Sequence, residues 1–210
     1  MFITLEGIEG SGKSTQIPRI KGHLQRLGHT CLVTKEPGGT TVGEQIRAIL
    51  LDPANNSLDS MAELLLYEAD RAQHVNRVIR PAMEAGKTVI CDRFSDSTVA
   101  YQGAARGISP DFIEKINTFV FGSLKPDITF LLDLPPEVGL SRAWQQINSG
   151  LRRHGESRFE QERIRFHEKV RQGYLALAEK EPGRIRVIDA LGSKEAVSEA
   201  IEEELNRVLK

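Results

Sequence analysis

The sequence has little of several features that mark specialised classes of protein. Its only two cysteines, Cys31 and Cys91, lie in apolar runs typical of core strands, so a structural disulfide or a cysteine-rich metal site has little support. No stretch approaches the ~18 apolar residues of a membrane span. The N-terminus enters a strand-like run directly, without the pattern of a signal peptide. We therefore expect a cytoplasmic protein.

Neither sign of charge dominates the chain. The 28 basic and 29 acidic residues give a net charge of −1, which supports neither a nucleic acid nor a membrane surface as a partner. Apolar residues make up 40% and charged residues 27% of the 210 positions, which is typical of a globular chain that forms one α/β domain.

One stretch carries a strong functional signal, because residues 7–14 read G-x-x-x-x-G-K-S. This is the phosphate-binding P-loop pattern, and it lies between an apolar strand-like run and a segment with helical spacing, as the motif requires. Lys13 is expected to reach the β- and γ-phosphates and the Ser14 hydroxyl to hold Mg²⁺. An ordinary glycine turn is the alternative, but it leaves the adjacent Lys-Ser unexplained. The predicted ATP-binding residues are Gly7, Ile8, Glu9, Gly10, Ser11, Gly12, Lys13, Ser14 and Thr15.

Apolar runs and turn signals predict the fold class. Five short apolar strands, at residues 1–5, 30–34, 88–91, 127–133 and 185–188, alternate with helical patterns. Ser60 and Glu63 have the spacing of a capping box that opens a long helix over residues 60–85. We predict an α/β fold with a five-stranded parallel sheet flanked by helices. It forms a single domain over residues 1–210, with a short mobile lid at about residues 145–158.

Ligands of an open parallel sheet bind beyond the carboxyl ends of its strands. Asp92 directly follows an apolar strand, where many P-loop proteins hold the metal ion. Arg93 beside it can bind a second phosphate bidentately; a surface ion pair is the less favoured alternative. Three predicted lid arginines are candidates to stabilise charge during phosphoryl transfer, although arginines in a polar loop usually only face solvent. They are Arg152, Arg153 and Arg158.

Tyr67 and Arg71 are four residues apart on a predicted helix and therefore neighbour each other. The ring could carry a nucleobase and Arg71 could donate to a base carbonyl. A donor-only guanidinium selects thymine or uracil, which present a carbonyl at position 4, over cytosine, which presents an amino group. On spacing alone, an ordinary surface Tyr–Arg pair is the favoured interpretation.

Over essentially its whole length the chain resembles the bacterial thymidylate kinases. The motifs that carry the resemblance are the P-loop, Glu36-Pro37-Gly38-Gly39-Thr40, Asp92-Arg93-Phe94, Ala100-Tyr101-Gln102-Gly103 and Leu132-Asp133-Leu134-Pro135-Pro136-Glu137. The resemblance implies that Glu9 binds the sugar 3′-OH, that Arg93 binds the 5′-phosphate, and that Tyr67, where the family usually has Phe, stacks on thymine. It further implies that Arg71 contacts O4 and that Ser97 and Thr98 read the N3 edge. Tyr101 then crowds a ribose 2′-OH, and Arg142 packs on adenine. Glu36, Pro37 and Gln102 complete the implied acceptor site.

The family divides over its catalytic arginine, which lies either in the P-loop or in the lid. This chain has small residues, Gly10 and Ser11, in the P-loop, and so resembles the members whose catalytic arginine lies in the lid. Our order of preference for this catalytic arginine is Arg153, then Arg158, then Arg152. The implied reaction is Mg²⁺-dependent transfer from ATP to dTMP, for dTTP synthesis, in a homodimer; the helix around Met61 to Met83 is apolar on more than one face.

Three alternatives to this reaction are open. A different (deoxy)nucleoside monophosphate kinase or a deoxynucleoside kinase keeps the donor site and changes the acceptor. A non-catalytic nucleotide switch is less favoured, because the Asn-Lys-x-Asp guanine-reading motif is absent from the sequence.

Overall fold

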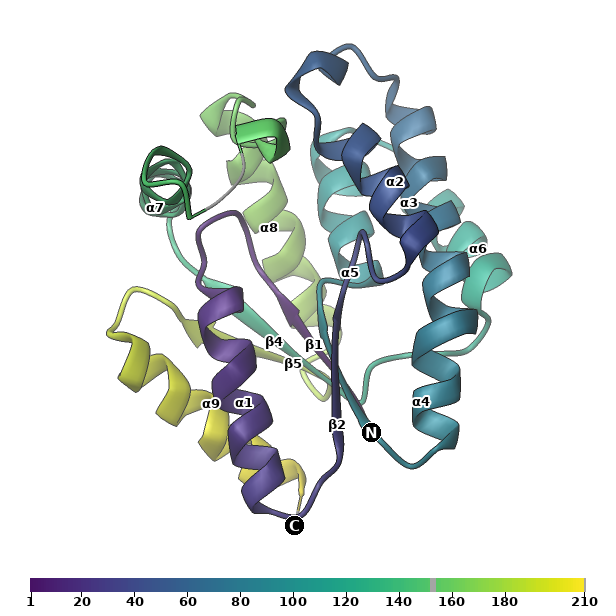
Figure 1. Cartoon of the computed structure of the whole chain (residues 1–210). Coiled ribbons are helices and arrows are strands. Elements are labelled where there is room, and N and C mark those ends of the chain that lie inside the picture. Colours follow the sequence, from purple (N-terminus) through teal and green to yellow (C-terminus); the bar gives the residue numbers. More distant parts are fainter. Residues whose placement is uncertain (152–153, 210) are drawn as a thin grey trace.

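Strand β1 forms the centre of a parallel sheet in the computed structural model, which describes residues 1–151 and 154–209 (Figure 1). The strands are β1 (Phe2–Glu6), β2 (Cys31–Lys35), β3 (Thr88–Asp92), β4 (Ile128–Asp133) and β5 (Ile185–Asp189). They pair in the order β2-β3-β1-β4-β5, and every pairing is parallel. All residues of β1 are buried, because a central strand has a neighbour on each edge and helices on each face. The predicted sheet is confirmed.

Helices cover both faces of the sheet. They are α1 (Lys13–Arg26), α2 (Thr41–Leu51), α3 (Ser60–His74), α4 (Arg80–Glu84), α5 (Ser95–Thr98), α6 (Pro110–Phe121), α7 (Pro136–Asn148), α8 (Ile164–Lys180) and α9 (Lys194–Val208), with the shorter turns η1 (Pro53–Asn55), η2 (Val75–Ile79), η3 (Val99–Ala105) and η4 (His154–Glu156). Helices α1 and α9 lie together on one side, and α5 and α8 lie on the other (Figure 1). No helix among the described residues is long and apolar enough to cross a membrane.

The start of α3 differs from the sequence prediction. Its cap is Asp59, whose Oδ1 accepts from the backbone N–H of Met61 at 2.8 Å and of Ala62 at 3.3 Å. Glu63 is fully buried and binds side chains from other elements, so it is not available for a capping box, and that prediction is wrong. The predicted helix over residues 60–85 is also divided, because the π-helical turn η2 separates α3 from α4.

Helix α7 extends further than the sequence suggests and continues to Asn148. The first residues of the predicted lid, 145–148, are therefore helical, and the buried Ile147 side chain anchors them. The turn η4 follows near the far end, and Arg158 is buried. Arg152 and Arg153 lie outside the described residues.

Candidate active site

The P-loop joins β1 to α1 and has the conformation that its glycines allow. Gly7, Gly10 and Gly12 have φ angles of 137°, 71° and 99°, which are left-handed values that side chains disfavour. A Cβ on Gly10 would lie 2.0 Å from the Gly139 carbonyl oxygen, so helix α7 also packs too closely for any other residue. The loop therefore requires glycine for its conformation and for its packing.

Lys13 spans the P-loop from the first turn of α1. Its Nζ donates to the carbonyl oxygens of Gly7 at 2.8 Å and Ile8 at 3.1 Å, and to Ser11 Oγ at 3.2 Å. Burial lowers the pKa of Lys13 to about 8, and the charge of Arg93 adds to this effect against the opposing charges of nearby carboxylates. An incoming phosphate would strengthen the charged form, because an adjacent anion raises the pKa of an amine.

Two cavities open beside the P-loop. One contains its inner surface and is lined by Glu9, Gly10, Ser11, Gly12, Lys13, Ser14, Lys35, Glu36, Arg47, Asp92, Arg93, Gln146 and Leu151. The other contains Thr15, Arg142 and the loop after β5. Arg142 Nη1 donates to the Ala190 carbonyl oxygen at 3.0 Å, which fixes the guanidinium at the wall of this second cavity. Phosphates and a flat base can therefore occupy neighbouring spaces on the two sides of the loop.

A third cavity adjoins the first and has the predicted acceptor residues in its wall. All ten line it: Glu9, Glu36, Pro37, Tyr67, Arg71, Arg93, Ser97, Thr98, Tyr101 and Gln102. The P-loop cavity and this acceptor cavity share Glu9, Glu36, Arg47 and Arg93. The two cavities thus meet at a boundary that carries two carboxylates and two guanidinium groups.

Arg93 is held at this boundary in an unusual backbone conformation. Its φ of 69° is the only positive value for a non-glycine residue in the described chain, and such strain persists only where surrounding contacts enforce it. Its Nη2 donates to Glu9 Oε1 at 3.1 Å, and its Nη1 donates to Tyr174 Oη at 3.1 Å and Ser97 Oγ at 3.3 Å. Three acceptors from three elements thus fix the guanidinium.

Glu6, at the end of β1, binds the same side chains that hold Arg93, and the sequence analysis did not identify it as a site residue. Its carboxylate accepts from Phe94 N at 2.7 Å, Ser97 Oγ at 2.6 Å and Tyr174 Oη at 2.8 Å. Burial, followed by the charge of Asp96, raises the pKa of Glu6 to about 7 against the opposing effect of Arg93. The available signal was a charged residue ending an otherwise apolar strand.

Glu9 remains a carboxylate despite its burial. Its Oε1 accepts from Tyr101 Oη at 2.6 Å, and its Oε2 lies 3.2 Å from His167 Nδ1. Burial alone would raise the pKa of Glu9, but the contacts with His167, Arg93 and Tyr101 outweigh it and hold the pKa well below its usual range. The group can therefore accept a hydrogen bond from a substrate hydroxyl.

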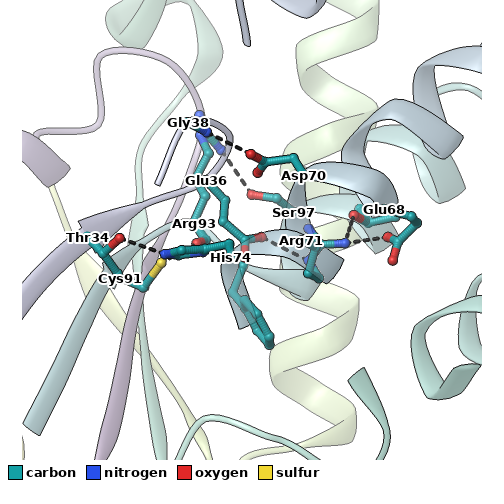
Figure 2. Close-up of polar contacts among 12 residues, drawn as sticks. Thr34, Glu36, Gly38, Glu68, Asp70, Arg71, His74, Cys91, Arg93 and Ser97 are labelled. Atoms are coloured by element: carbon teal, nitrogen blue, oxygen red, sulfur yellow. Dashed lines mark hydrogen bonds and ion pairs between the residues drawn. The ribbon is translucent and has the colours of Figure 1, made fainter. Parts of the chain in front are cut away.

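Arg71 lies in a buried polar network (Figure 2). Its Nε donates to Glu36 Oε2 at 2.8 Å, and its Nη1 donates to Thr98 Oγ1 at 3.0 Å and to Glu68. Behind it, His74 Nδ1 lies 2.9 Å from Glu36 Oε1. Arg71 is 1% exposed, so the surface Tyr–Arg pair that spacing alone favoured is wrong.

Arg158 lies away from the P-loop cavity in this conformation. Its Nη1 forms an ion pair of 2.7 Å with buried Glu63, and its Nε donates to the Leu50 carbonyl oxygen. Glu63 also accepts from Gln102 Nε2 at 2.8 Å. The contacts join the end of the lid segment to α2, α3 and η3.

Arg47 is a second residue that sequence analysis missed. It lies on α2 and lines both the P-loop and the acceptor cavities. Its Nη1 donates to the Pro37 carbonyl oxygen at 3.0 Å, and its Nε donates to Glu156 Oε2 at 3.1 Å. The sequence offered no signal beyond a basic residue within a short helix.

The glycines of the P-loop surround Lys13, and Arg93 lies at the boundary between the P-loop cavity and the acceptor cavity. This arrangement defines a P-loop nucleotide kinase, in which a donor phosphate and an acceptor phosphate meet. The family model for thymidylate kinase matches residues 5–201. The chain belongs to the thymidylate kinase family.

Individual relatives agree along the whole chain. It is 55% identical to a thymidylate kinase of Desulfosudis oleivorans, over 99% of this chain and 97% of the relative. It is 51% identical to one of Geobacter sulfurreducens, with the same coverage. The crystal structure of thymidylate kinase from Ehrlichia chaffeensis superposes with a TM-score of 0.77 at 34% identity, covering 100% of this chain and 98% of the other.

Proposed function

We propose that this chain is an ATP-dependent dTMP kinase, which transfers the γ-phosphoryl group of ATP to the 5′-phosphate of dTMP and gives ADP and dTDP for dTTP synthesis. The observation that carries this proposal is the pair of adjoining cavities that share Glu9 and Arg93. The cytoplasm is the place we propose for the reaction.

The donor end binds ATP through residues 7–15. Backbone N–H groups of the loop and the N-terminus of α1 face the phosphates, and Lys13 turns from the loop carbonyl oxygens toward the β- and γ-phosphates. Arg142 packs on the adenine in the cavity beside the loop after β5.

Ser14 and Asp92 fit a magnesium ion that accompanies the phosphates. Both line the P-loop cavity, and Asp92 Oδ1 is buried without a hydrogen-bond partner among the described residues. Mg²⁺ usually takes one or two protein oxygens and completes its shell with phosphate and water. This agrees with the absence, in the described part of the chain, of any cluster of three or more acidic, His or Cys metal ligands. When bound, the ion neutralises charge on the β- and γ-phosphate oxygens.

The acceptor end binds dTMP through ten residues of its cavity wall. Arg93 holds the 5′-phosphate, and Glu9 accepts a hydrogen bond from the sugar 3′-OH. Tyr101 excludes a 2′-OH, Tyr67 stacks on the base, and Glu36, Pro37, Ser97 and Gln102 complete the wall. Arg71 donates to O4, and Thr98 accepts from N3–H.

Transfer proceeds in line and without a covalent enzyme intermediate. An oxygen of the dTMP phosphate forms a bond to the γ-phosphorus, and the bond from that phosphorus to the β,γ-bridging oxygen breaks, so that ADP leaves with the electron pair. Because Gly10 supplies no cation, an arginine of the lid stabilises the transferring group; Arg153 is preferred over Arg158 and Arg152.

An acceptor panel tests the function. With ATP as donor, dTMP is expected to be phosphorylated with a far higher kcat/KM than dCMP, dGMP or thymidine. Preferred turnover of dCMP or dGMP would point to another monophosphate kinase, and preferred turnover of thymidine would point to a deoxynucleoside kinase.

We also propose a homodimer with an isologous interface of α3 and α6. The two helices pack together and expose large apolar side chains, which are Met61 (39%), Leu65 (50%), Phe112 (40%) and Phe119 (90%). A second copy would cover this surface symmetrically. Sedimentation at micromolar concentration should give a dimer, and Leu65→Glu should give a monomer; a monomeric parent would contradict the proposal.

A further inference from the structure

Tyr174 has no role in the reaction described above, yet its hydroxyl contacts the arginine to which we assign the acceptor phosphate. It lies on α8, is 2% exposed and lines neither the P-loop cavity nor the acceptor cavity. Its Oη accepts from Arg93 Nη1 at 3.1 Å and donates to Glu6 Oε2 at 2.8 Å. The residue thus joins α8 to the end of β1 and to the segment after β3.

The position of the Tyr174 hydroxyl is set by close packing. A Cβ on the preceding residue, Gly173, would lie 2.7 Å from Ala104 Cβ and 3.2 Å from Ala100 Cα, so α8 approaches η3 as closely as a glycine allows. The Tyr174 ring packs edge-on against the Tyr101 ring, with the ring centroids 6.2 Å apart, which is a favourable arrangement of two aromatic rings. The hydroxyl is therefore held in a fixed position.

The contacts of Arg93 decide which of its protons remain free. A guanidinium has five N–H protons and can only donate. Both protons of Nη1 are used, by Tyr174 Oη at 3.1 Å and Ser97 Oγ at 3.3 Å, and one proton of Nη2 is used by Glu9 Oε1 at 3.1 Å. The Nε–H and the second Nη2–H have no partner among the described residues. Nε and Nη2 form one edge of the guanidinium, and such an edge can bind a phosphate bidentately.

Tyr174 contributes to the rotation of this guanidinium about its axis. The guanidinium carbon of Arg93 lies 5.1 Å from the centroid of the Tyr101 ring, but contact with an aromatic face does not select one edge over another. The hydrogen bonds at Nη1 do select, because they turn Nη1 toward α8 and leave the Nε–Nη2 edge for the cavities that Arg93 lines. The Arg93 side chain is 18% exposed, which leaves room for a ligand.

We propose that Tyr174 is a positioning residue that orients the Nε–Nη2 edge of Arg93 toward the 5′-phosphate of the acceptor nucleotide. Glu6 orients the Tyr174 hydroxyl in turn, since the proton donated to Glu6 leaves only lone pairs for Arg93. Without the Tyr174 hydroxyl, one Nη1 proton loses its acceptor in a buried site, and the guanidinium turns to recover one. This inference rests on the proposed function and deepens it.

The test compares the affinities of dTMP and thymidine, measured calorimetrically, in the parent and in Tyr174→Phe. Thymidine has the same base and sugar but no phosphate, so the ratio of its Kd to the Kd of dTMP isolates the contribution of the phosphate. We expect this ratio to fall by about tenfold in Tyr174→Phe, as for the loss of one hydrogen bond to a charged group. The Kd of thymidine should stay within about twofold of the parent, because thymidine has no phosphate for Arg93 to hold.

An unchanged ratio would overturn the proposal. Equal weakening of both ligands would then make Tyr174 a purely structural residue, whereas no weakening of either would show that Ser97 and Glu9 orient Arg93 without it. A parent that binds dTMP no more tightly than thymidine would also overturn the proposal, because it would have no phosphate contact to position.

Thr4→Val is the matched control, because it also removes one buried hydroxyl and keeps the shape of the side chain. Thr4 is on β1, two residues before Glu6, and is fully buried, and its Oγ1 lies 2.7 Å from Thr129 Oγ1. No hydrogen bond joins it to Arg93 in the described part of the chain, so the ratio should equal that of the parent. The same fall in both variants would overturn the proposal in favour of a general loosening of the fold.

A double-mutant cycle with Arg93→Lys isolates the pair. A lysine has no bidentate edge to orient, so Tyr174→Phe should change the ratio by less than about twofold in that background. A fall of about tenfold there would overturn the proposal. If Tyr174→Phe does not fold, Ser97→Ala, which removes the other acceptor of Nη1, takes its place in the cycle, and the ratio is again expected to fall.

Failure of the proposed function has a different signature, because it is measured as turnover. If the parent bound dTMP through its phosphate but did not phosphorylate it, the proposed function would fail. The ratio of the two Kd values would still decide whether Tyr174 positions Arg93.

Discussion

The donor and acceptor ends of the active site are built in different ways. The donor end is nine consecutive residues whose function depends on backbone conformation and on one lysine, which is tied to loop carbonyl oxygens. The acceptor end collects side chains from the P-loop, the segment after β2, α2, α3, the segment after β3, α5 and η3. A contiguous site can be specified by a short motif, whereas a dispersed site depends on the packing of the whole domain.

Charge is also distributed differently between the two ends. At the acceptor cavity the protein holds its own balanced charges, such as the pair of Glu36 with Arg71 in the wall and the pair of Glu63 with Arg158 beside it, all nearly fully buried. At the donor end the negative charge arrives with the nucleotide. Removing one partner at the acceptor end strands a buried charge and costs stability, whereas a change at the donor end should cost activity alone.

Lys13→Ala gives the largest expected effect and tests the donor half of this comparison. Loss of the cation that faces the β- and γ-phosphates should lower kcat by about 10²–10³-fold. The melting temperature should change little, because Lys13 bonds only to the loop in which it lies. Near-normal turnover in a folded variant would contradict the assignment.

Glu6→Gln tests the acceptor half through stability against pH. The pKa of Glu6 is raised to about 7 from 4.5, so between these values the folded chain binds a proton that the unfolded chain has released. Raising the pH across this window therefore lowers the free energy of unfolding, by an amount on the order of 3 kcal/mol for this group. Chemical denaturation of the variant should lack this part of the decline.

Asp70 contributes to the same slope, because burial raises its pKa to about 6. Asp70 is present in both the parent and Glu6→Gln, so its contribution cancels when the pH dependence of their free energies of unfolding is compared. Ser14→Ala, at the donor end, serves as the control and should retain the full slope of the parent. If the free energy of unfolding declined equally with pH in Glu6→Gln and in the parent, the folded chain would not hold a proton on the Glu6 carboxyl.

Two arginines of the predicted lid segment should show the same contrast between loss of activity and loss of stability. Arg153→Ala should lower kcat by about a hundredfold if this residue acts on the transferring group. Arg158→Ala should instead destabilise the fold by about 3 kcal/mol, because it removes one of the two guanidinium partners of buried Glu63, and its kcat should fall much less. Steady-state kinetics and denaturation of both variants decide between these effects; a stable Arg158→Ala with a hundredfold loss of kcat would reverse the assignment.

The same difference explains how much could be predicted from the sequence. The sheet and the P-loop follow from local patterns, and resemblance to the family supplied ten of the residues of the acceptor wall. Glu6 and Arg47 were missed because each acts through partners that are distant in sequence. Glu63 was wrongly assigned to a capping box for a related reason. Its spacing from Ser60 fits a local cap, but three side chains that are distant in sequence bind its carboxylate.

The smallest expected effect concerns Tyr67, whose ring forms part of the acceptor wall. Its hydroxyl has no hydrogen-bond partner among the described residues, so Tyr67→Phe should leave kcat and KM for dTMP within about threefold of the parent. Tyr67→Ala removes the ring and should raise KM for dTMP by about tenfold, as expected for the loss of one base–aromatic stack. Because Tyr67 does not line the P-loop cavity, KM for ATP should be unchanged in both variants, which confines the effect to the acceptor end. An equal rise of KM for dTMP in Tyr67→Phe and in Tyr67→Ala would show that the hydroxyl, and not the ring, binds the substrate, because both variants lack the hydroxyl.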